Sequence, residues 1–120
     1  MTKIKIKSQL KKYNIMKPEF ESIPLVKNEE KKRFEIELNG HFAFIDYKET
    51  SHQIALIHTE AEPELAGTGA AAAVVEKTLI YIEESGKKLL PFCPYVFAFI
   101  RKHPEWKRIV EERFESYDKL

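Results

Sequence analysis

The sequence predicts a single α+β domain whose sheet combines antiparallel and parallel strands. Apolar and charged residues alternate over 33–38, which is the period-two pattern of a half-buried strand. Asn39-Gly40 follows directly and is the strongest short hairpin signal, because a type I′ turn requires positive φ at both central residues. Further along, an Ala-rich segment with helical spacing separates two strand-like segments, the pattern of a βαβ crossover. We therefore expect an antiparallel meander extended by one parallel pair, with helices packed on it.

Length and composition agree with one globular domain. The chain has 120 residues, of which 43% are hydrophobic, enough for a core but too short for a second domain. That hydrophobic fraction argues against wholesale disorder. No apolar run approaches the roughly 20 residues that span a bilayer, and residues 1–10 alternate Lys and Ile without the apolar region of a signal peptide. We expect no membrane partner.

Charge and cysteine content narrow the class further. The 20 Lys+Arg and 19 Asp+Glu leave a net charge of +1, which argues against a protein held to nucleic acid by bulk charge. Cys93 is the only cysteine, so an internal disulfide framework and a Cys-based zinc cluster are excluded. A reducing, cytoplasmic compartment fits this composition best. No pattern indicates an oligomeric state.

The central elements follow from periodicity and turn residues. Antiparallel strands are expected over 33–38, 41–48 and 52–59. A helix is expected from Ala70 to about Ser85, ended by Gly86 as a left-handed cap, and a short strand over 88–92 should lie parallel to 52–59. The helix has an apolar face and an opposite, charged face: Ala71, Val74, Val75, Leu79 and Ile82 against Glu76, Lys77, Glu83 and Glu84.

The C-terminal part is expected to be helical. A short apolar helix over 96–102 should end at His103-Pro104, and Glu105 should open a last helix. The apolar stripe of that last helix would comprise Trp106, Ile109, Val110, Phe114 and Tyr117.

Residues 1–24 are interpreted as an N-terminal extension of a domain that spans 25–120. Residues 1–33 carry ten basic and four acidic residues, a net charge of +6, whereas 34–120 carry ten and fifteen, a net charge of −5. The alternation from Lys3 to Lys7 is compatible with a short edge strand, and Pro18 then interrupts regular structure. We favour a solvated or loosely docked extension. The alternative is a basic arm for a nucleic acid or acidic partner, although it lacks the interleaved aromatics that base stacking needs.

The predicted topology locates a site at one edge of the sheet. In parallel βα units, ligands bind outside the carboxyl ends of the strands, where helix N-termini point. Here this edge comprises the Gly67-Thr68-Gly69 loop, His58 and Thr59 at the end of one strand, and Cys93 after the other. Glycines let backbone N–H groups approach a diphosphate, and the helix dipole favours an anion. A Gly-x-Gly sequence that opens a helix is, on its own, more often a tight turn without a ligand.

These residues resemble those of a known family. Ala66-Gly67-Thr68-Gly69-Ala70-Ala71 resembles the acetyl-CoA loop of the GCN5-related N-acetyltransferases (GNAT), Arg/Gln-x-x-Gly-x-Gly/Ala. The segments 58–60, 91–96 (Pro-Phe-Cys-Pro-Tyr-Val) and 100–106 (Ile-Arg-Lys-His-Pro-Glu-Trp) resemble its minimal acetyltransferase-like subgroup. The resemblance covers about 26–112. It departs at Ala66, where the motif has Arg or Gln, and at 1–24, which have no counterpart.

The resemblance implies a GNAT-like mixed sheet and a site for acetyl-CoA or coenzyme A. Backbone amides of Gly67, Thr68, Gly69, Ala70 and Ala71 would bind the diphosphate, and Ile57 to Thr59 would pair with the pantetheine arm. Cys93 and His58 match the suspected catalytic pair of the subgroup. Arg101 and Lys102 lie where cations would meet the phosphates and partly replace what Ala66 lacks; this last assignment is our own inference.

Each candidate residue also has a simpler interpretation. Cys93 alone is more often a small buried apolar residue, and His58 a satisfied polar residue at a strand end. As neighbours at two strand ends they would form a Cys–His pair, in which His58 takes a proton from the thiol or the incoming amine. His41, His52 and His103 are interpreted as incidental. No convergent set of metal ligands is evident, so no metal site is predicted.

We expect an acyltransferase that moves an acetyl group from acetyl-CoA to an unidentified amine. Two routes stay open: direct attack by the amine, or a covalent acyl-Cys93 intermediate. The alternative function is a non-catalytic sensor or accessory module that binds CoA or acyl-CoA. A third hypothesis, an interaction protein that works through its basic arm, would not require CoA binding.

Overall fold

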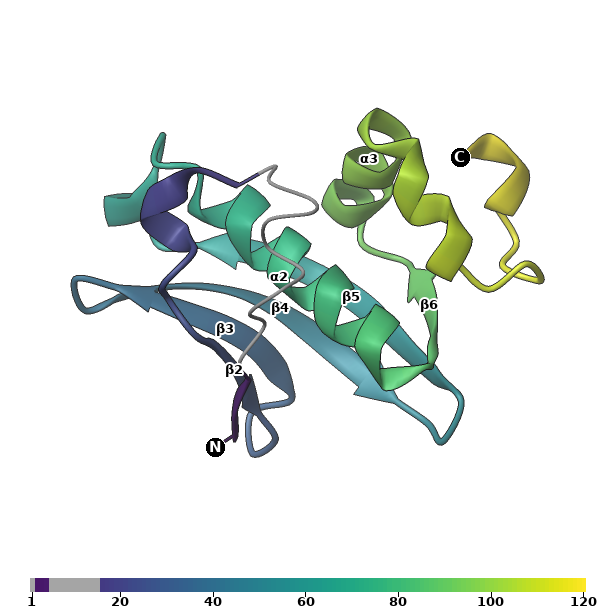
Figure 1. Cartoon of the computed structure of the whole chain (residues 1–120), viewed down its shortest axis with the longest axis horizontal. Helices are drawn as coiled ribbons and strands as arrows, with labels where there is room; N and C mark the ends of the chain where they lie inside the picture. Colours follow the sequence, from purple (N-terminus) through teal and green to yellow (C-terminus); the bar gives the residue numbers. More distant parts are fainter. Residues whose placement is uncertain (1, 5–15) are drawn as a thin grey trace.

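The computed structural model describes residues 2–4 and 16–120 and shows a six-stranded mixed sheet (Figure 1). The strand order is β1-β2-β3-β4-β5-β6. All neighbouring strands are antiparallel except β5 and β6, which are parallel. The strands comprise Thr2–Ile4 (β1), Leu25–Asn28 (β2), Arg33–Leu38 (β3), His41–Glu49 (β4), Gln53–Ala61 (β5) and Lys88–Pro91 (β6). The predicted meander with one parallel pair is confirmed.

The hairpin between β3 and β4 has the predicted geometry. Asn39 and Gly40 both have positive φ, 53° and 82°, as a type I′ turn requires. Leu38 and His41 face each other directly across the turn. This tight connection sets the register that places Phe34, Ile36 and Ile45 in the core.

The sheet extends further toward the N-terminus than expected. β2 was not predicted, and it pairs with β3 through Val26, Lys27 and Asn28. Thr2–Ile4 then pairs with Leu25–Lys27 at the edge of the sheet. The edge strand predicted over Lys3–Lys7 is confirmed for Lys3 and Ile4, whereas residues 5–7 lie outside the described residues.

Helix α2 (Ala70–Ser85) packs across one face of the sheet (Figure 1). It ends as predicted, at Gly86 with φ 78°, whose N–H donates to the carbonyl of Glu83. The predicted charged face is wrong in part, because Glu76 and Lys77 are buried. Glu76 Oε1 accepts a hydrogen bond of 2.8 Å from the backbone N–H of Met16. The segment before β2 therefore lies against what would otherwise be the exposed side of α2.

The N-terminal segment differs from the expectation of a solvated or loosely docked extension over residues 16–24. Met16 and Phe20 belong to the hydrophobic core, and Phe20 lies in the short 3-10 helix η1 (Pro18–Phe20). The core therefore extends back to Met16, and the packing marks no boundary at residue 24. The physical reason is that the apolar side chains of Met16, Phe20 and Ile23 pack against the core, which is enough to dock the segment.

The C-terminal part also differs from the prediction. Helix α3 (Pro94–Lys102) begins two residues earlier than expected, with Pro94 in its first turn. The expected last helix is replaced by the 3-10 helix η3 (Pro104–Ile109), a parallel bridge from Val110 to Leu89, and the short η4 (Tyr117–Lys119). The spacing of three between Trp106 and Ile109 fits a 3-10 turn, in which residues i and i+3 lie on the same side.

A part-buried ion pair ties β2 to the end of β4. Lys27 Nζ lies 2.7 Å from Glu49 Oε1 and 5.5 Å from the centre of the Tyr47 ring. Burial raises the pKa of Glu49, but hydrogen bonds from Lys27 and Lys87 outweigh it, so the pKa lies below its ordinary value of 4.5. The folded protein therefore binds fewer protons at Glu49 than the unfolded chain does between these two values.

We expect the free energy of unfolding to fall as the pH drops below about 4.5 and through the lower pKa of Glu49 in the folded state. Glu49→Gln should be destabilised relative to the parent at pH 7, and this difference should shrink at pH 3, because a falling pH favours the protonated carboxyl, which cannot form the ion pair. Urea unfolding at both pH values measures the effect. A difference that is the same at pH 7 and pH 3 would show that the ionised pair contributes nothing.

Phe20→Ala should lower the free energy of unfolding by about 3–5 kcal/mol, because it empties a fully buried aromatic site. Phe92→Ala is the matched control, since Phe92 is 57% exposed and its loss should cost about 1 kcal/mol or less. Chemical unfolding measures both. Equal, small losses would mean that the N-terminal segment does not pack in solution.

Candidate functional site

The candidate site is built around the point where β5 and β6 separate. The two strands pair only over Gln53–Leu56 and Lys88–Pro91, whereas β5 continues to Ala61. The N–H of Cys93 donates to the carbonyl of Leu56 at 2.8 Å, just past the last paired residues. Among the described residues, no strand pairs with Ile57–Ala61 on this side. Their backbone polar groups therefore form an open strand edge, onto which an extended ligand with amide groups can pair.

Two prolines explain why β6 ends while β5 continues. Pro91 has no N–H to donate to the ladder, and Pro94 begins α3, which leads the chain out of the sheet. The pairing of β4 with β5 shifts register directly after Leu56, the last residue of β5 that pairs with β6. Tyr47 faces Leu56 and Asp46 faces His58, so Ile57 is an extra residue in β5. Such bulges are over-represented next to active sites because they re-aim side chains.

The structure brings Cys93 next to Thr59. Cys93 is 2% exposed, and its Sγ lies 3.2 Å from Thr59 Oγ1. The expected Cys93–His58 pair is not formed, because the side chain of His58 is 58% exposed and lies 3.5 Å from Glu60 Oε1. The extra residue Ile57 is the reason. In a regular strand residues 56 and 58 share a face, but the shift places Thr59 instead on the face of Leu56. The catalytic roles of Cys93 and His58 stay predictions.

The glycine loop lies at the start of α2. Gly67 and Gly69 have φ of 77° and 91°, which explains why this turn uses glycine. The Thr68 hydroxyl donates to the carbonyl of Leu65 and accepts from the N–H of Ala70, which fixes the loop internally. The first helical hydrogen bond runs from the N–H of Ala73 to the carbonyl of Gly69. The amides of Ala71 and Ala72 thus precede the helical ladder, and helix starts of this kind favour anions.

A cavity of about 190 Å³ lies between the first turn of α2 and one side of α3 along its whole length. Ala72 lines one side, and Lys102 is the cation at its rim, whereas Arg101 lies outside the lining. The lining residues are Ala72, Tyr95, Ala98, Phe99, Lys102 and His103. An apolar hollow with one cation, next to a helix start, is suited to an elongated ligand that carries phosphates at one end.

Tyr95 also lines this cavity, although the sequence analysis gave it no role beyond its place in the resembling segment 91–96. Burial and then the nearby Cys93 raise the pKa of its hydroxyl above the ordinary value. Tyr95 therefore stays protonated at neutral pH and can donate a hydrogen bond or a proton into the cavity. Its position two residues after Cys93, at the start of a helix that follows a parallel strand, is the signal that would have identified it.

A larger hollow of about 370 Å³ lies on α3 where the C-terminal segment packs against it. It is lined by Pro91, Phe92, Pro94, Phe97, Phe114, Glu115, Ser116 and Lys119. Phe92 and Phe114 meet edge to face with centroids 5.3 Å apart. The sequence analysis missed this hollow, because it treated Phe114 and Tyr117 as the buried stripe of a helix.

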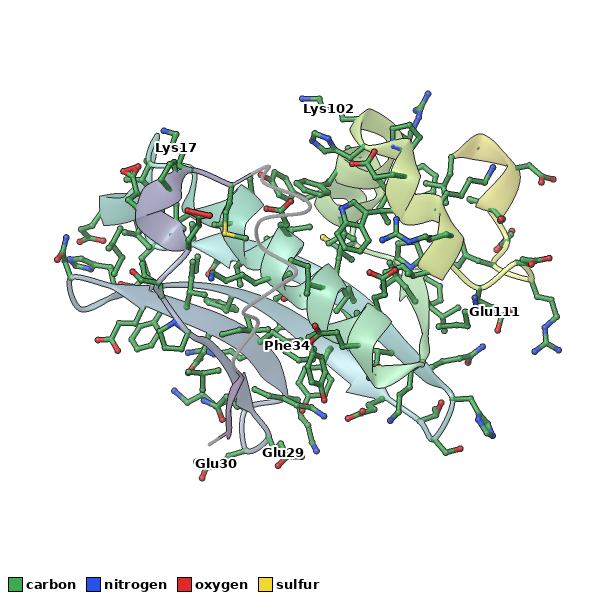
Figure 2. All side chains as sticks on the ribbon, viewed as in Figure 1. Lys17, Glu29, Glu30, Phe34, Lys102 and Glu111 are labelled. Atoms are coloured by element: carbon green, nitrogen blue, oxygen red, sulfur yellow. The ribbon has the colours of Figure 1, made fainter. Side chains whose placement is uncertain are left out.

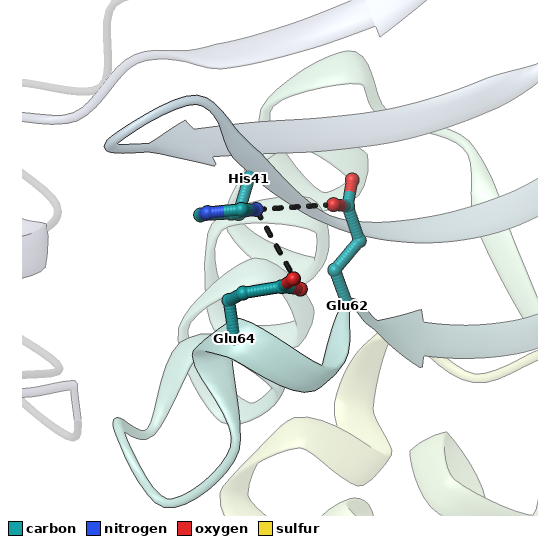
Figure 3. A group of neighbouring side chains, drawn as sticks. All are labelled: His41, Glu62 and Glu64. Atoms are coloured by element: carbon teal, nitrogen blue, oxygen red, sulfur yellow. Dashed lines mark hydrogen bonds and ion pairs between the residues drawn. The ribbon is translucent and has the colours of Figure 1, made fainter.

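His41, Glu62 and Glu64 form a cluster beside the loop (Figure 3). His41 Nδ1 lies 3.3 Å from Glu62 Oε1 and 3.6 Å from Glu64 Oε1, and Glu62 Oε2 accepts a 3.0 Å bond from the N–H of Phe42. The interpretation of His41 as incidental is therefore wrong. Among the described residues, these three have ligand atoms close enough to share a metal ion. Their direct contacts explain the cluster as a hydrogen-bonded link that fastens η2 (Pro63–Leu65), which leads into the loop, to β4.

A comparison with known families identifies the fold around this site. A model of the GCN5-related N-acetyl-transferase family matches residues 33–109. The chain belongs to this family. The matched residues include the open edge of β5, the glycine loop, Cys93 and Tyr95, and the resemblance found in the sequence is confirmed. Membership in the GCN5-related N-acetyltransferase family supports acyltransferase activity in general, and the family generally uses acetyl-CoA.

In the described part of the chain, no helix is long and apolar enough to cross a membrane.

Cys93 should react with iodoacetamide at least about tenfold more slowly in the folded protein than in urea, because buried thiols are inert. Thr59→Ala should speed the reaction, since it removes the group in contact with Sγ, whereas His58→Ala should leave it unchanged. Quenched labelling followed by mass spectrometry measures the rates. Rapid labelling of the folded parent that His58→Ala slows would instead support the Cys–His pair.

Proposed function

We propose that the protein transfers an acetyl group from acetyl-CoA to an amine. The observation that carries this proposal is the open edge of β5 beside the start of α2, within the residues matched by the family. The edge offers backbone hydrogen bonds to the amides of a pantetheine arm, and the glycine loop offers amides to a diphosphate. The described residues therefore fit both the pantetheine arm and the diphosphate of acetyl-CoA.

In this proposal, different parts of the site bind different parts of the cofactor. Ile57 and Thr59 pair through their backbone with the pantetheine arm, while the loop holds the diphosphate through Gly67, Thr68, Gly69, Ala70 and Ala71. Arg101 and Lys102 contribute positive charge, with Lys102 directly at the cavity between α2 and α3. Two of these amides already have partners: the N–H of Thr68 donates to the carbonyl of Leu65, and the N–H of Ala70 donates to the hydroxyl of Thr68.

Acetyl-CoA supplies the activated acyl thioester, and the residues of the chain supply orientation and proton transfer. In direct transfer, the amine nitrogen forms a bond to the carbonyl carbon while the carbon–sulfur bond breaks. Because the pKa of Tyr95 is raised, its hydroxyl stays protonated and can donate the proton that the leaving thiolate requires. His58 is exposed beyond the bulge, where it can meet an incoming amine and accept its proton.

Direct transfer is better supported than the acyl-Cys93 route. A covalent intermediate needs the Cys93 sulfur to reach the thioester carbonyl, but the thiol is almost completely buried and contacts Thr59. The buried thiol instead helps to raise the pKa of Tyr95.

The Cys93→Ala variant should therefore keep most of the turnover of the parent if transfer is direct. It should lose all turnover if Cys93 carries the acetyl group.

The second candidate function, a CoA-binding module without turnover, is favoured by one observation. The residues expected to form the catalytic pair do not meet, because Thr59, which contacts Cys93, and His58 lie on different faces of β5. Calorimetric titration with acetyl-CoA and a turnover assay with a panel of amines distinguish the two. Binding with turnover supports the transferase, binding without turnover supports the module, and the absence of binding contradicts both.

Gly69→Asp should weaken acetyl-CoA binding at least about tenfold more than Gly69→Asn, because only the first places a negative charge at the diphosphate. The two side chains have nearly the same shape, and both Asn and Asp tolerate the positive φ of 91° at this position. Gly69→Asp should be at least as stable as Gly69→Asn, because a Cβ at this position lies 3.8 Å from Lys17 Nζ, so its weaker binding cannot be a folding effect. Calorimetry and thermal unfolding measure both properties, and equal affinities would exclude this loop as the diphosphate site.

A further inference from the structure

Lys17 lies over the glycine loop, although it comes from the N-terminal segment. A Cβ atom placed on Gly69 would lie 3.4 Å from Lys17 Cε and 3.8 Å from Lys17 Nζ. Figure 2 shows Lys17 on the opposite side of the molecule from Glu29 and Glu30, which lie in the turn between β2 and β3. The ammonium group is therefore adjacent to the start of α2.

Contacts on both sides of Lys17 hold its backbone in place. The preceding residue, Met16, is buried and donates its N–H to Glu76 of α2 at 2.8 Å. The carbonyl of Lys17 accepts a 3.0 Å hydrogen bond from Phe20, whose side chain is in the core. Pro18 restricts the backbone between these two anchors. The position of Lys17 over the loop thus follows from packing that its own side chain does not supply.

The positive charge of Lys17 and the start of α2 together favour an anion. Lys17 is exposed, and its side chain makes no hydrogen bond or ion pair with any residue that the structure describes. The N-terminus of α2 is the positive end of the helix dipole, where a cation is unfavourable and an anion is favourable. A bound phosphate group would reverse this repulsion, since it attracts both the ammonium and the helix start.

The loop also lacks a cation of its own. Ala66 occupies the position at which the family motif carries Arg or Gln, so that side chain contributes nothing to an anion. We propose that Lys17 supplies the missing positive charge and contacts the diphosphate of CoA across Gly69. This inference rests on the proposed function. Lys17 lies outside the matched residues 33–109, so its role is a property of this chain and its N-terminal segment.

The test compares CoA with S-acetylpantetheine, which has the same arm but no diphosphate, by calorimetric titration. Lys17→Ala should weaken CoA binding about tenfold and leave S-acetylpantetheine binding unchanged, because only CoA carries the anion. The loss should shrink at high salt. Lys31→Ala is the matched control: it removes the same charge in the exposed β2–β3 turn, away from the loop, and should change neither affinity.

A rescue variant separates the charge of Lys17 from a structural effect. Lys17→Ala combined with Ala66→Arg should recover most of the lost CoA affinity, because it restores a cation on the loop itself. Thermal unfolding confirms that each variant is folded. Equal CoA affinity of the parent and Lys17→Ala, or tighter binding by the variant, would overturn the role of Lys17 alone. No CoA binding by the parent would overturn the proposed function, and the role of Lys17 with it.

Discussion

Beyond Leu56 the two parallel strands part, and the candidate site depends on that separation. Pro91 ends the hydrogen-bonded ladder between β5 and β6, and Pro94 starts α3. The hydrogen bond from the N–H of Cys93 to the carbonyl of Leu56 holds the end of β6 against β5. A fully paired β6 would use the backbone groups that β5 now presents at an open edge. The first turn of α2 and one side of α3 then line a cavity next to this edge.

The glycine loop is held from two directions by residues outside it. On one side, His41 in β4 binds the carboxylates of Glu62 and Glu64, which fastens the turn that leads into the loop. On the other side, Met16 binds Glu76 in the second turn of α2, and the side chain of Lys17 then lies against Gly69. A phosphate-binding loop gains from this rigidity, because amides that are already oriented lose little entropy when an anion binds.

The three candidate catalytic groups lie in different surroundings, and these suit different roles. Cys93 is buried against Thr59, which argues against a freely reacting thiol. Tyr95 is held in its protonated form by burial and by the neighbouring Cys93, which suits a proton donor to a leaving thiolate. His58 projects from the other face of β5 and meets solvent, which suits a group that receives a proton from an incoming amine.

The sequence by itself determined the features that depend on local backbone preference: the Asn39-Gly40 hairpin, the α2 helix with its Gly86 cap and the glycine loop. It also determined the parallel pair, because a strand–helix–strand order returns the second strand parallel to the first. The tertiary structure alone decided which faces are covered and which side chains meet. Glu76 is buried because Met16 binds it, and Thr59 rather than His58 meets Cys93 because Ile57 shifts the register. Periodicity reports the local alternation of a segment, whereas coverage and bulges depend on contacts between residues far apart in the chain.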